Sequence, residues 1–304
     1  MRNQQTDIIE DLAAADHEEA KALIDLCMRP DETLSMAEDF PLLVGPEAKS
    51  LRLVCKEGGR ILAHVAAREL ALDTPDGGVL ALWNIGAVVT AEAARGRGLA
   101  SALIEECLRR GKEQGAAAAV LWTDRPDFYA RLGFSPAGRE LAVHVPRERL
   151  VNVAPVPIRP LHPAELEEIL ALREKDPFCA RRPLEDWRRL HGLPRSRCFV
   201  APAMGPVLAA LVFGKGCDFE GMITEWVGDV SLLPRMLRTL LDTLRLEETT
   251  IFGPAKRRDF RETFERLQCR RLEQPLALFA PLADAAFLQN PLLDRLYLRG
   301  LDSM

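Results

Sequence analysis

The sequence predicts an α/β protein with a mixed α+β sheet in each of two tandem domains of similar fold. Three observations favour this class. The chain has 304 residues, which is long for one domain and typical of two. A proline-rich stretch at residues 151–160 divides it near the middle, and prolines favour a stiff, extended linker. Two blocks of the first half also recur in the second, so we expect domains at residues 1–150 and 161–283 and a tail at 284–304.

The first half predicts its elements in a clear order. Apolar side chains at helical spacing indicate a helix over residues 16–28. Extended runs at residues 51–55 and 61–72 flank the turn pair Gly58-Gly59, which predicts a hairpin. A third, unbroken strand is expected over residues 79–90. The half therefore begins as a helix followed by antiparallel strands.

The pattern then changes to a strand, loop, helix and strand. A helix is expected over residues 97–114, and a glycine follows it, as glycine often does at a helix end. A short apolar run at residues 117–122 predicts a strand, and residues 126–132 are expected to form a short helix. A last strand near residues 140–145 completes the expected first half, which gives a mixed sheet with helices.

The second half repeats this order. Residues 199–209 resemble the hairpin residues 53–63, and residues 264–269 resemble residues 129–134. The two blocks occur in the same sequence order and at matching places in their halves. A duplicated fold explains this better than coincidence in short apolar stretches.

Composition excludes several classes of protein. Apolar residues make up 48% and charged residues 28% of the chain, which is an ordinary globular balance. No run of 18 apolar residues occurs, so we expect no membrane span and no membrane partner. The acidic start has no apolar core of a signal peptide, and seven scattered cysteines without a CxxC pair indicate reduced thiols in a cytoplasmic protein. A net charge of −5 argues against nucleic acid as a partner.

One stretch carries the chemistry of an anion site. Residues 85–101 run from a strand through a loop with two glycines and two arginines directly into a helix. Gly96 and Gly98 let backbone N–H groups approach a ligand, and the helix start adds unpaired N–H groups and the positive end of its dipole. Arg95 and Arg97 add positive charge. The spacing is that of neither an ATP-binding P-loop nor a dinucleotide fingerprint, but the site suits a pyrophosphate.

Two motifs in this half resemble one known family. The residues Arg95-Gly-Arg-Gly98-Leu-Ala100 match [RQ]-x-x-G-x-[GA], and the preceding Val-Val-Thr is a common approach to it. The residues from Tyr129 to Phe134 match Y-x-x-L-G-F. With both motifs in the right order, residues 5–150 resemble the GNAT superfamily of acyl-CoA-dependent N-acyltransferases. The resemblance implies acetyl-CoA as the acyl donor, an amine as the acceptor and no metal; no metal-binding motif occurs in the chain.

The resemblance also implies roles for individual residues. Val88, Val89 and Thr90 would offer backbone groups to the pantetheine arm. Tyr129 would protonate the departing thiolate, since the pKa of a phenol is close to that of a thiol. The pyrophosphate would be held by consecutive residues, namely Arg95, Gly96, Arg97, Gly98, Leu99, Ala100 and Ser101.

The general base is the point at which the sequence departs from the family. Asn84 stands where many members have a glutamate on the central strand. An amide takes no proton at pH 7, but it can hold a water that relays one, or orient the amine. Glu69, His64 and His144 are alternative bases, and an amine of low pKa would need none.

The second half lacks the residues that carry this chemistry. Pro234 stands in place of the glycine loop, and Phe264 in place of Tyr129. By resemblance it is a degenerate GNAT-like domain that walls the pocket, covers the first domain's sheet or forms a homodimer. The tail is expected to pack against the rest of the protein, because it carries five leucines: Leu292, Leu293, Leu296, Leu298 and Leu301.

The sequence thus predicts a cytoplasmic N-acetyltransferase acting on a small-molecule or peptide amine, with Tyr129 and Asn84 in the catalytic site. Two alternatives remain open. One is a non-catalytic acyl-CoA sensor, which the missing carboxylate at Asn84 favours. The other is a scaffold in which both halves are inert, which the intact loop from Arg95 to Ala100 opposes.

Overall fold

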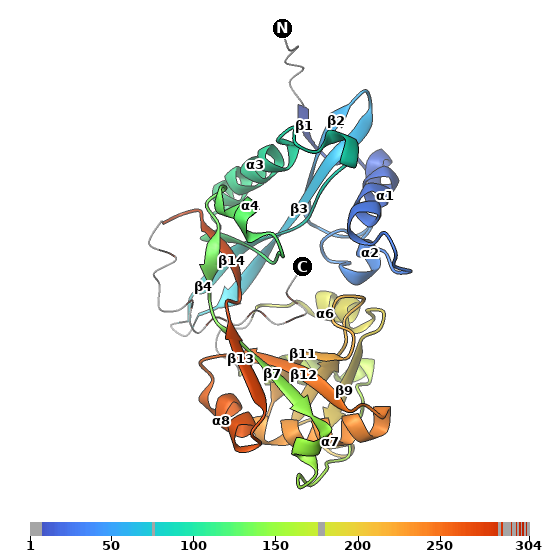
Figure 1. The fold of residues 1–304 in the computed structure, drawn as a ribbon, viewed down its shortest axis with the longest axis vertical. Coiled ribbons are helices and arrows are strands. Elements are labelled where there is room, and N and C mark those ends of the chain that lie inside the picture. The colour runs from blue at the N-terminus through green and yellow to red at the C-terminus, as the bar shows by residue number, and fades with distance from the viewer. Residues whose placement is uncertain are drawn as a thin grey trace.

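The computed structural model describes residues 8–74, 77–175 and 180–284, and, beyond these, six single residues: Phe287, Leu293, Leu296, Leu298, Gly300 and Asp302. Within these residues the strands form two mixed sheets of seven strands each. We call them the first and the second sheet. Figure 1 shows the first sheet and its helices in the upper part of the molecule and the second in the lower part. The predicted fold class, two tandem domains with mixed sheets and flanking helices, is confirmed.

The first sheet contains the predicted hairpin and the long strand that follows it. The antiparallel ladder has Leu53 opposite Val65 in its first pair of strands and Leu70 opposite Leu82 in its second. Its strands, in spatial order, are β1 (Ile8–Asp11), β2 (Leu51–Glu57), β3 (Arg60–Asp73), β4 (Val79–Thr90), β5 (Ala118–Leu121), β14 (Ala277–Pro281) and β6 (Ser135–Ala137).

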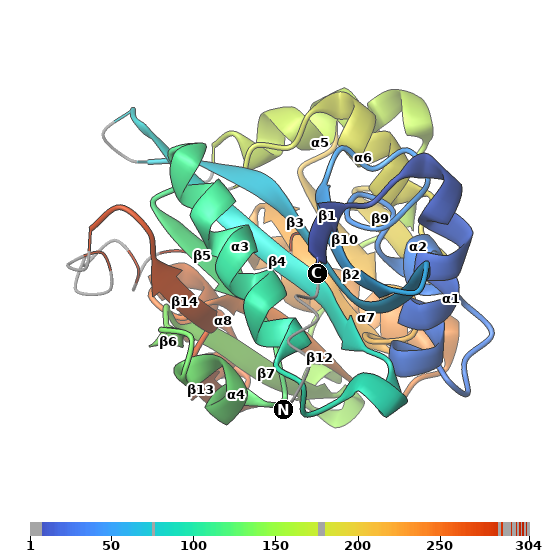
Figure 2. The ribbon, with the colours of Figure 1, turned by 90° about the horizontal axis from the view of Figure 1, so that it is seen from above.

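Helices cover both faces of the first sheet. Alternate residues of a strand face opposite sides, so Leu53 packs under α3 (Leu99–Glu113) while its neighbour Val54 packs under α1 (His17–Met28). Figure 2 shows α1 and α3 on opposite sides of β2 and β3. The remaining helical segments of this part are η1 (Ala14–Asp16), α2 (Met36–Asp39), η2 (Glu92–Ala94) and α4 (Pro126–Ala130).

The second sheet repeats this arrangement. The hairpin of β9 and β10 corresponds to that of β2 and β3, and the following strand leads through a short 3₁₀ turn into a helix, as β4 does. The spatial order is β13 (Arg270–Gln274), β7 (Glu140–Pro146), β12 (Glu248–Pro254), β11 (Met222–Gly228), β10 (Ala209–Phe213), β9 (Arg197–Ala201) and β8 (Arg159–Pro160). Its helical segments are η3 (Arg147–Leu150), η4 (Pro163–Glu165), α5 (Leu166–Arg173), α6 (Leu184–His191), η5 (Val230–Leu232), α7 (Leu233–Leu244) and α8 (Arg258–Arg266). The predicted duplication is confirmed.

Two strands cross from one half of the chain to the sheet of the other. The strand expected near residues 140–145 forms as β7, but it does not complete the first sheet: it pairs with β12 and β13 of the second. In return β14 pairs with β5 and β6 in the first sheet. Figure 1 shows the green strand β7 beside the orange strands β12 and β13. The expectation was wrong about the sheet because alternating polarity marks a strand without naming its partner.

This exchange changes the place of the proline-rich segment. The chain has already entered the second sheet at β7 before it reaches residues 151–160, so these residues do not run between the sheets. They lie along α7 instead, where Val156 is buried and its carbonyl accepts a hydrogen bond from Thr239 Oγ1 at 2.7 Å. The last two residues of the segment form β8. In the described parts of the chain, no helix is long and apolar enough to cross a membrane.

Candidate active site

A large cavity opens where the central strands of the first sheet separate. β4 and β5 pair only from Leu82–Ala118 to Asn84–Val120, so among the described residues β4 has no strand partner on this side beyond Asn84. The cavity of about 1060 Å³ begins at this gap. Its walls come from β4, the loop before α3, α4, the end of α1, and the second sheet. It is therefore built by both halves of the chain.

The strand segment at the gap is the one predicted to meet the pantetheine arm. Val88, Val89 and Thr90 all line the cavity. The ladder between β3 and β4 shifts register here, between His64 and Ala66, and Ala87 has a positive φ of 49°. This bulge bends β4 away from β5 and leaves backbone groups facing the cavity.

The glycine loop forms the mouth of the same cavity. Gly96 and Gly98 have φ of 80° and 85°, a left-handed conformation that side chains disfavour, and the space in front of both is open. α3 begins after Gly98 with no side-chain cap and no acidic residue in its first turn. Its first N–H groups are thus available to an anion.

Most residues predicted to hold a pyrophosphate line this mouth, and one does not. The lining residues of the loop are Arg95, Gly96, Gly98, Leu99, Ala100 and Ser101. The Arg97 side chain instead forms an exposed ion pair with Glu57, with Nη2 3.1 Å from Oε1. Arg95 is exposed, and among the described residues no ion pair holds its guanidinium. Of the two arginines, only Arg95 lines the cavity.

Tyr129 lies on α4 at the inner part of the cavity wall. Its ring packs edge-on against Phe128 and Phe134, with centroids 4.9 and 5.8 Å away. Among the described residues no hydrogen bond holds its hydroxyl. Burial raises the pKa of Tyr129 to about 12, with a smaller opposing effect of Arg125. The phenol is therefore protonated and free to donate at neutral pH.

Asn84 lies under the cavity without lining it. Its side chain is fully buried, and Nδ2 donates to the backbone oxygen of Asp302 at 3.0 Å. Its Oδ1 has no hydrogen-bond partner among the described residues. The residue therefore holds the C-terminal segment, a role that the sequence did not indicate.

The three alternative bases lie outside the cavity. His64 is fully buried and its Nδ1 lies 2.9 Å from the Ala87 carbonyl oxygen. Glu69 is exposed on β3, and His144 is on β7 with Nε2 3.4 Å from a carboxylate oxygen of Glu248. None of the three faces the gap between β4 and β5.

The far wall of the cavity consists of residues that sequence reasoning missed. The second sheet and its loops contribute Glu140, Asp218, Phe219, Phe252 and Gln274. Glu140 and Gln274 are opposite each other on β7 and β13, and Gln274 Nε2 donates to Glu140 Oε1 at 2.8 Å. No local motif marks these residues, because each is a single polar or aromatic residue in an ordinary strand or in a loop.

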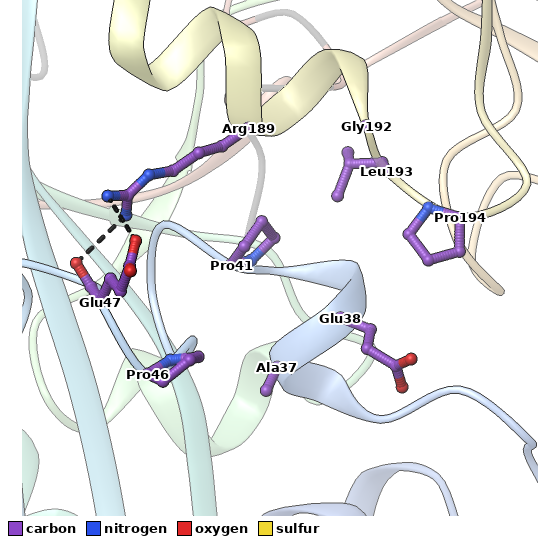
Figure 3. Close-up of a pocket in the computed structure, with 9 residues that line it drawn as sticks. All are labelled: Ala37, Glu38, Pro41, Pro46, Glu47, Arg189, Gly192, Leu193 and Pro194. Atoms are coloured by element: carbon purple, nitrogen blue, oxygen red, sulfur yellow. Dashed lines mark hydrogen bonds and ion pairs between the residues drawn. The ribbon is translucent and has the colours of Figure 1, made fainter.

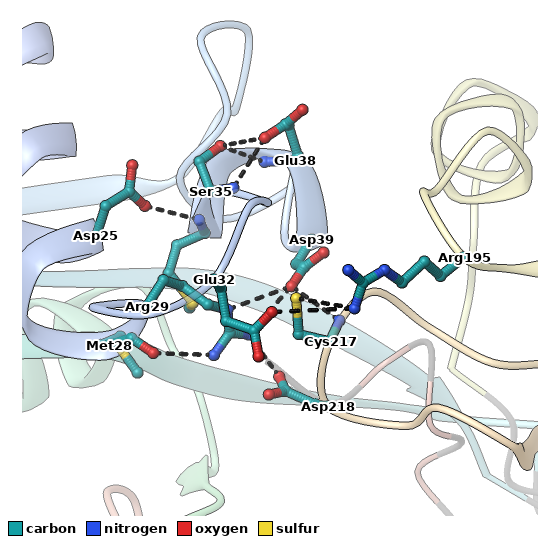
Figure 4. A network of polar contacts seen from close by, with 11 residues as sticks. Asp25, Met28, Arg29, Glu32, Ser35, Glu38, Asp39, Arg195, Cys217 and Asp218 are labelled. Atoms are coloured by element: carbon teal, nitrogen blue, oxygen red, sulfur yellow. Dashed lines mark hydrogen bonds and ion pairs between the residues drawn. The ribbon is translucent and has the colours of Figure 1, made fainter.

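An ion network fastens the second half to the first beside the cavity. Arg29, at the end of α1, donates to Asp39 Oδ2 at 3.2 Å and to Asp218 Oδ2 at 2.8 Å (Figure 4). The backbone N–H of Cys217 also donates to Asp39, at 3.2 Å. A Cβ on Gly216 would lie 2.1 Å from Asp39 Oδ1, so glycine is needed for this close approach. The network fixes the loop that carries Asp218 and Phe219.

Two described residues near the C-terminus also belong to the cavity wall. Leu298 and Gly300 line it, and Lys215 Nζ donates to the Gly300 oxygen at 2.8 Å. Leu293 and Leu296 are buried with Leu298 in the core beneath the first sheet. These are three of the five leucines for which packing was expected; Leu292 and Leu301 lie outside the described residues.

Asp302 joins a buried ion cluster that we call the four-ion cluster: Arg173, Arg182, Glu225 and Asp302. Each arginine contacts both carboxylates, at distances from 2.6 to 3.1 Å. All four side chains are buried, and both guanidiniums lie over the ring of Trp187.

The corresponding gap in the second sheet is filled. Trp226 Nε1 donates to the Phe252 oxygen at 2.9 Å, which bridges β11 and β12 where they diverge. Phe260 stacks on Trp226 with centroids 5.1 Å apart, and Phe264, the counterpart of Tyr129, is fully buried. Pro234 lies in the first turn of α7, where it removes a backbone donor. This half therefore lacks the features of the first site.

A second, open pocket of about 370 Å³ lies at the seam between the halves (Figure 3). Pro41 and Pro46 form one side and Leu193 and Pro194 the other. Arg189 spans it, with Nη2 3.0 Å from Glu47 Oε2. It shares no lining residue with the large cavity and contains no nucleophile. Among the described residues, no group of three or more histidine, cysteine, aspartate or glutamate side chains could hold a metal ion.

Comparisons with known proteins agree with this geometry. A family model described as an acetyltransferase (GNAT) domain matches residues 9–137. Comparison with curated protein sequences gave no match.

Solved structures extend the likeness to both halves. A probable N-acyltransferase from Enterococcus faecalis V583 has a TM-score of 0.72 at 14% identity, over 90% of this chain and 72% of that one. Eis1 from Mycobacterium abscessus has a TM-score of 0.63 at 16% identity, over 91% of this chain and 74% of that one. The N-myristoyltransferase of Saccharomyces cerevisiae was solved with bound myristoyl-CoA. It has a TM-score of 0.56 at 12% identity, over 92% of this chain and 80% of that one. At these identities the likeness is one of fold.

Proposed function

Residues 9–137 of this chain form a GNAT acetyltransferase domain, the first half of a tandem GNAT-like fold, and from this premise we propose that the protein transfers an acetyl group from acetyl-CoA to a primary amine. One observation carries the proposal. A single cavity joins the uncapped start of α3, the bulged end of β4 and the phenol of Tyr129. These are the three contacts that an acyl-CoA thioester requires.

Acetyl-CoA is the donor substrate in this proposal, and the loop fits it. The pyrophosphate takes backbone N–H groups of the loop from Gly96 to Ser101, with Arg95 beside it. The pantetheine arm occupies the gap that β5 leaves along β4, where it pairs with Val88 and Thr90 as a strand would. The thioester then lies between β4 and α4.

The chemistry is direct attack by the neutral amine. Its nitrogen forms a bond to the thioester carbon, while backbone N–H groups of β4 stabilise the negative charge on the carbonyl oxygen. The C–S bond breaks, and the nitrogen loses a proton to solvent as the amide forms. The departing thiolate receives a proton from Tyr129, and the phenolate regains one from solvent. The phenol carries its proton throughout the neutral range, so the acid form is present, and burial makes it a weaker acid than a free phenol.

The first test is calorimetric titration of acetyl-CoA. We expect micromolar binding to the wild-type protein and none to Gly98→Trp, whose indole occupies the mouth of the cavity. Gly59→Trp is a matched control, because Gly59 has φ of 82°, is exposed and likewise has open space in front of it. It lies in the β2–β3 turn, and its variant should bind as the wild type does. Absence of binding to the wild type would end the acyltransferase proposal.

Replacement of the proposed acid separates an enzyme from a sensor. We expect Tyr129→Phe to lower kcat by about 10²-fold, because the thiolate must then leave without a proton. The affinity for acetyl-CoA should change less than twofold, since the ring remains packed between Phe128 and Phe134. Release of free CoA with an amine panel measures the first quantity and calorimetry the second. If the wild type binds acetyl-CoA but acetylates no amine, the alternative of a non-catalytic acyl-CoA sensor, which the buried amide of Asn84 favours, replaces the enzyme.

A further inference from the structure

The carboxylates of the large cavity differ in how they are neutralised. Asp218 is paired with Arg29 at 2.8 Å, and Asp124 is exposed beside the donor end. Glu140 is half-buried, and among the described residues no lysine, arginine or histidine lies within ion-pair distance of it. Its one hydrogen-bond partner there is the neutral amide of Gln274. A carboxylate that lines a cavity and has no cationic side chain of the protein beside it is a binding site for a cationic ligand.

The position of Glu140 is fixed by the exchanged strand. It is the first residue of β7, with Pro254 of β12 on one side and Gln274 of β13 on the other. It therefore reaches the cavity from the second sheet, opposite the glycine loop. The other charged or titratable groups that line the cavity are Cys27, Arg29, Arg95, Asp124, Arg125, Tyr129 and Asp218.

Aromatic rings also line the cavity. Phe219 and Phe252 meet edge-to-face, with centroids 6.2 Å apart and planes at 86°, and Phe128 adjoins Tyr129. All of these rings line the cavity. Such rings bury an apolar body and offer their faces to a cation. A highly hydrated polyamine gains little from them.

Building on the function proposed above, we propose that Glu140 binds the ammonium group of the acceptor and removes its proton. The acceptor is then a primary amine attached to an apolar group the size of an aromatic ring. The step balances as follows. One proton passes from the ammonium nitrogen to a carboxylate oxygen of Glu140, which leaves a neutral amine and a neutral carboxylic acid. The amine then attacks the thioester, and Glu140 returns its proton to solvent between turnovers.

Burial brings the two partners of this transfer closer in acidity. It raises the pKa of Glu140 to about 7, against the smaller lowering by Gln274. The same apolar surroundings lower the pKa of an ammonium group, since they disfavour its charge. A base with a pKa near the working pH is the most effective one.

The test compares wild type and Glu140→Gln with 2-phenylethylamine and putrescine as acceptors at saturating acetyl-CoA. We expect the variant to lose about 10²-fold in kcat/KM for 2-phenylethylamine, with unchanged calorimetric affinity for acetyl-CoA. In the wild type kcat/KM should rise as the pH passes through about 7, because the carboxylate is the active form, and the variant should lack this limb. Glu273→Gln is the matched control: its carboxylate, on the same strand as Gln274, pairs with Arg261 at 2.9 Å outside the cavity.

The variant also has a stability signature that a structural carboxylate lacks. A carboxyl group whose pKa is raised in the folded state costs stability as the pH rises from 4.5 through about 7. At pH 8 Glu140→Gln should therefore melt at or above the wild-type temperature while being less active. This result excludes misfolding as the cause of the lost activity.

Each other outcome overturns a defined part of the proposal. Suppose that the wild type acetylates 2-phenylethylamine and that Glu140→Gln keeps kcat/KM within threefold and still shows its rise near pH 7. Glu140 then neither binds the ammonium group nor removes its proton. If putrescine has the higher kcat/KM, the inference that the acceptor carries an apolar group is wrong. If the wild type acetylates no amine in a broad panel, the proposed function itself fails, whatever the variant does.

Discussion

At the scale of single residues, His64 shows how burial fixes a protonation state. A carbonyl oxygen only accepts hydrogen bonds, so Nδ1, 2.9 Å from the Ala87 oxygen, carries the proton. Nε2 is buried and has no partner among the described residues, so a second proton there would be an unpaired charge. Burial accordingly lowers the pKa of His64 to about 4. The neutral ring holds the bulged strand at Ala87, next to the segment proposed to bind pantetheine.

This predicts a pH-dependent term in stability. Because the folded pKa lies below the unfolded value of 6.5, the unfolded chain binds the proton first. The contribution is complete above pH 6.5 and is lost as the pH falls through about 4, by about 3 kcal/mol in all. We expect His64→Gln to remove this slope from the free energy of unfolding in urea between pH 7.5 and 4.5. His144→Gln, on the more exposed β7 position, should keep it; equal slopes in both variants would contradict the assignment.

At the scale of elements, α3 depends on one close approach to the first sheet. Gly111 packs on the Trp83 side chain of β4, where a Cβ would lie 2.7 Å from Cγ and Cδ1 of the ring. The ring is held in turn by Nε1, which donates to Cys107 Sγ at 3.3 Å. The glycine weakens the helix locally but lets its last turns lie flat on the strand. This contact sets the direction of the helix whose other end forms the anion site.

We expect Gly111→Ala to destabilise the protein although alanine is the better helix former. The propensity gain is about 1 kcal/mol, whereas overpacking against the ring costs about 1–3 kcal/mol. The difference in the free energy of unfolding, measured in urea, should be a loss of about 1 kcal/mol. Lys112→Ala, an exposed change in the same turn, should stay within about 0.5 kcal/mol. A net gain in Gly111→Ala would show that the helix can shift away from Trp83.

At the scale of the whole molecule, the two halves are joined by strand exchange and by the C-terminal segment. The four-ion cluster of Arg173, Arg182, Glu225 and Asp302 is buried and carries no net charge. Through its backbone oxygen Asp302 also accepts the bond from Asn84 of the first sheet. The cluster and Asn84 thereby fix Asp302, two residues after Gly300, which lines the cavity, and the cavity walls come from both halves.

Removal of one charge from this cluster should be costly. Asp302→Asn leaves two buried arginines with one carboxylate, and we expect a loss of about 3–5 kcal/mol in the free energy of unfolding. Asp186→Asn is the comparison, because Asp186 also joins the halves, through Arg68 at 2.8 Å, but in a partly exposed pair. It should lose about 1 kcal/mol or less. Similar losses in urea unfolding of the two variants would show that water reaches the cluster.

The sequence predicted a large part of the fold and of the donor side of the site. The hairpin, β4, α3 and the repeat in the second half form as expected, because each depends on a local period of apolar residues. Gly98 and Tyr129 could be singled out because their motifs are short and continuous in the chain. Asn84 was singled out too, but only its place on the strand could be inferred, since its partner, Asp302, lies at the other end of the sequence.

The sequence by itself therefore determined the local pattern. It showed which segments form helices and strands, where left-handed glycines precede an uncapped helix, and where Tyr129 follows in the chain. The tertiary structure alone decided that β7 and β14 exchange sheets, that Glu140 lines the cavity and that Asp302 joins the buried four-ion cluster. The physical reason is that a period of two or 3.6 residues tells which side of an element is apolar. It does not tell which distant element will cover that side, and this choice depends on packing across the whole molecule.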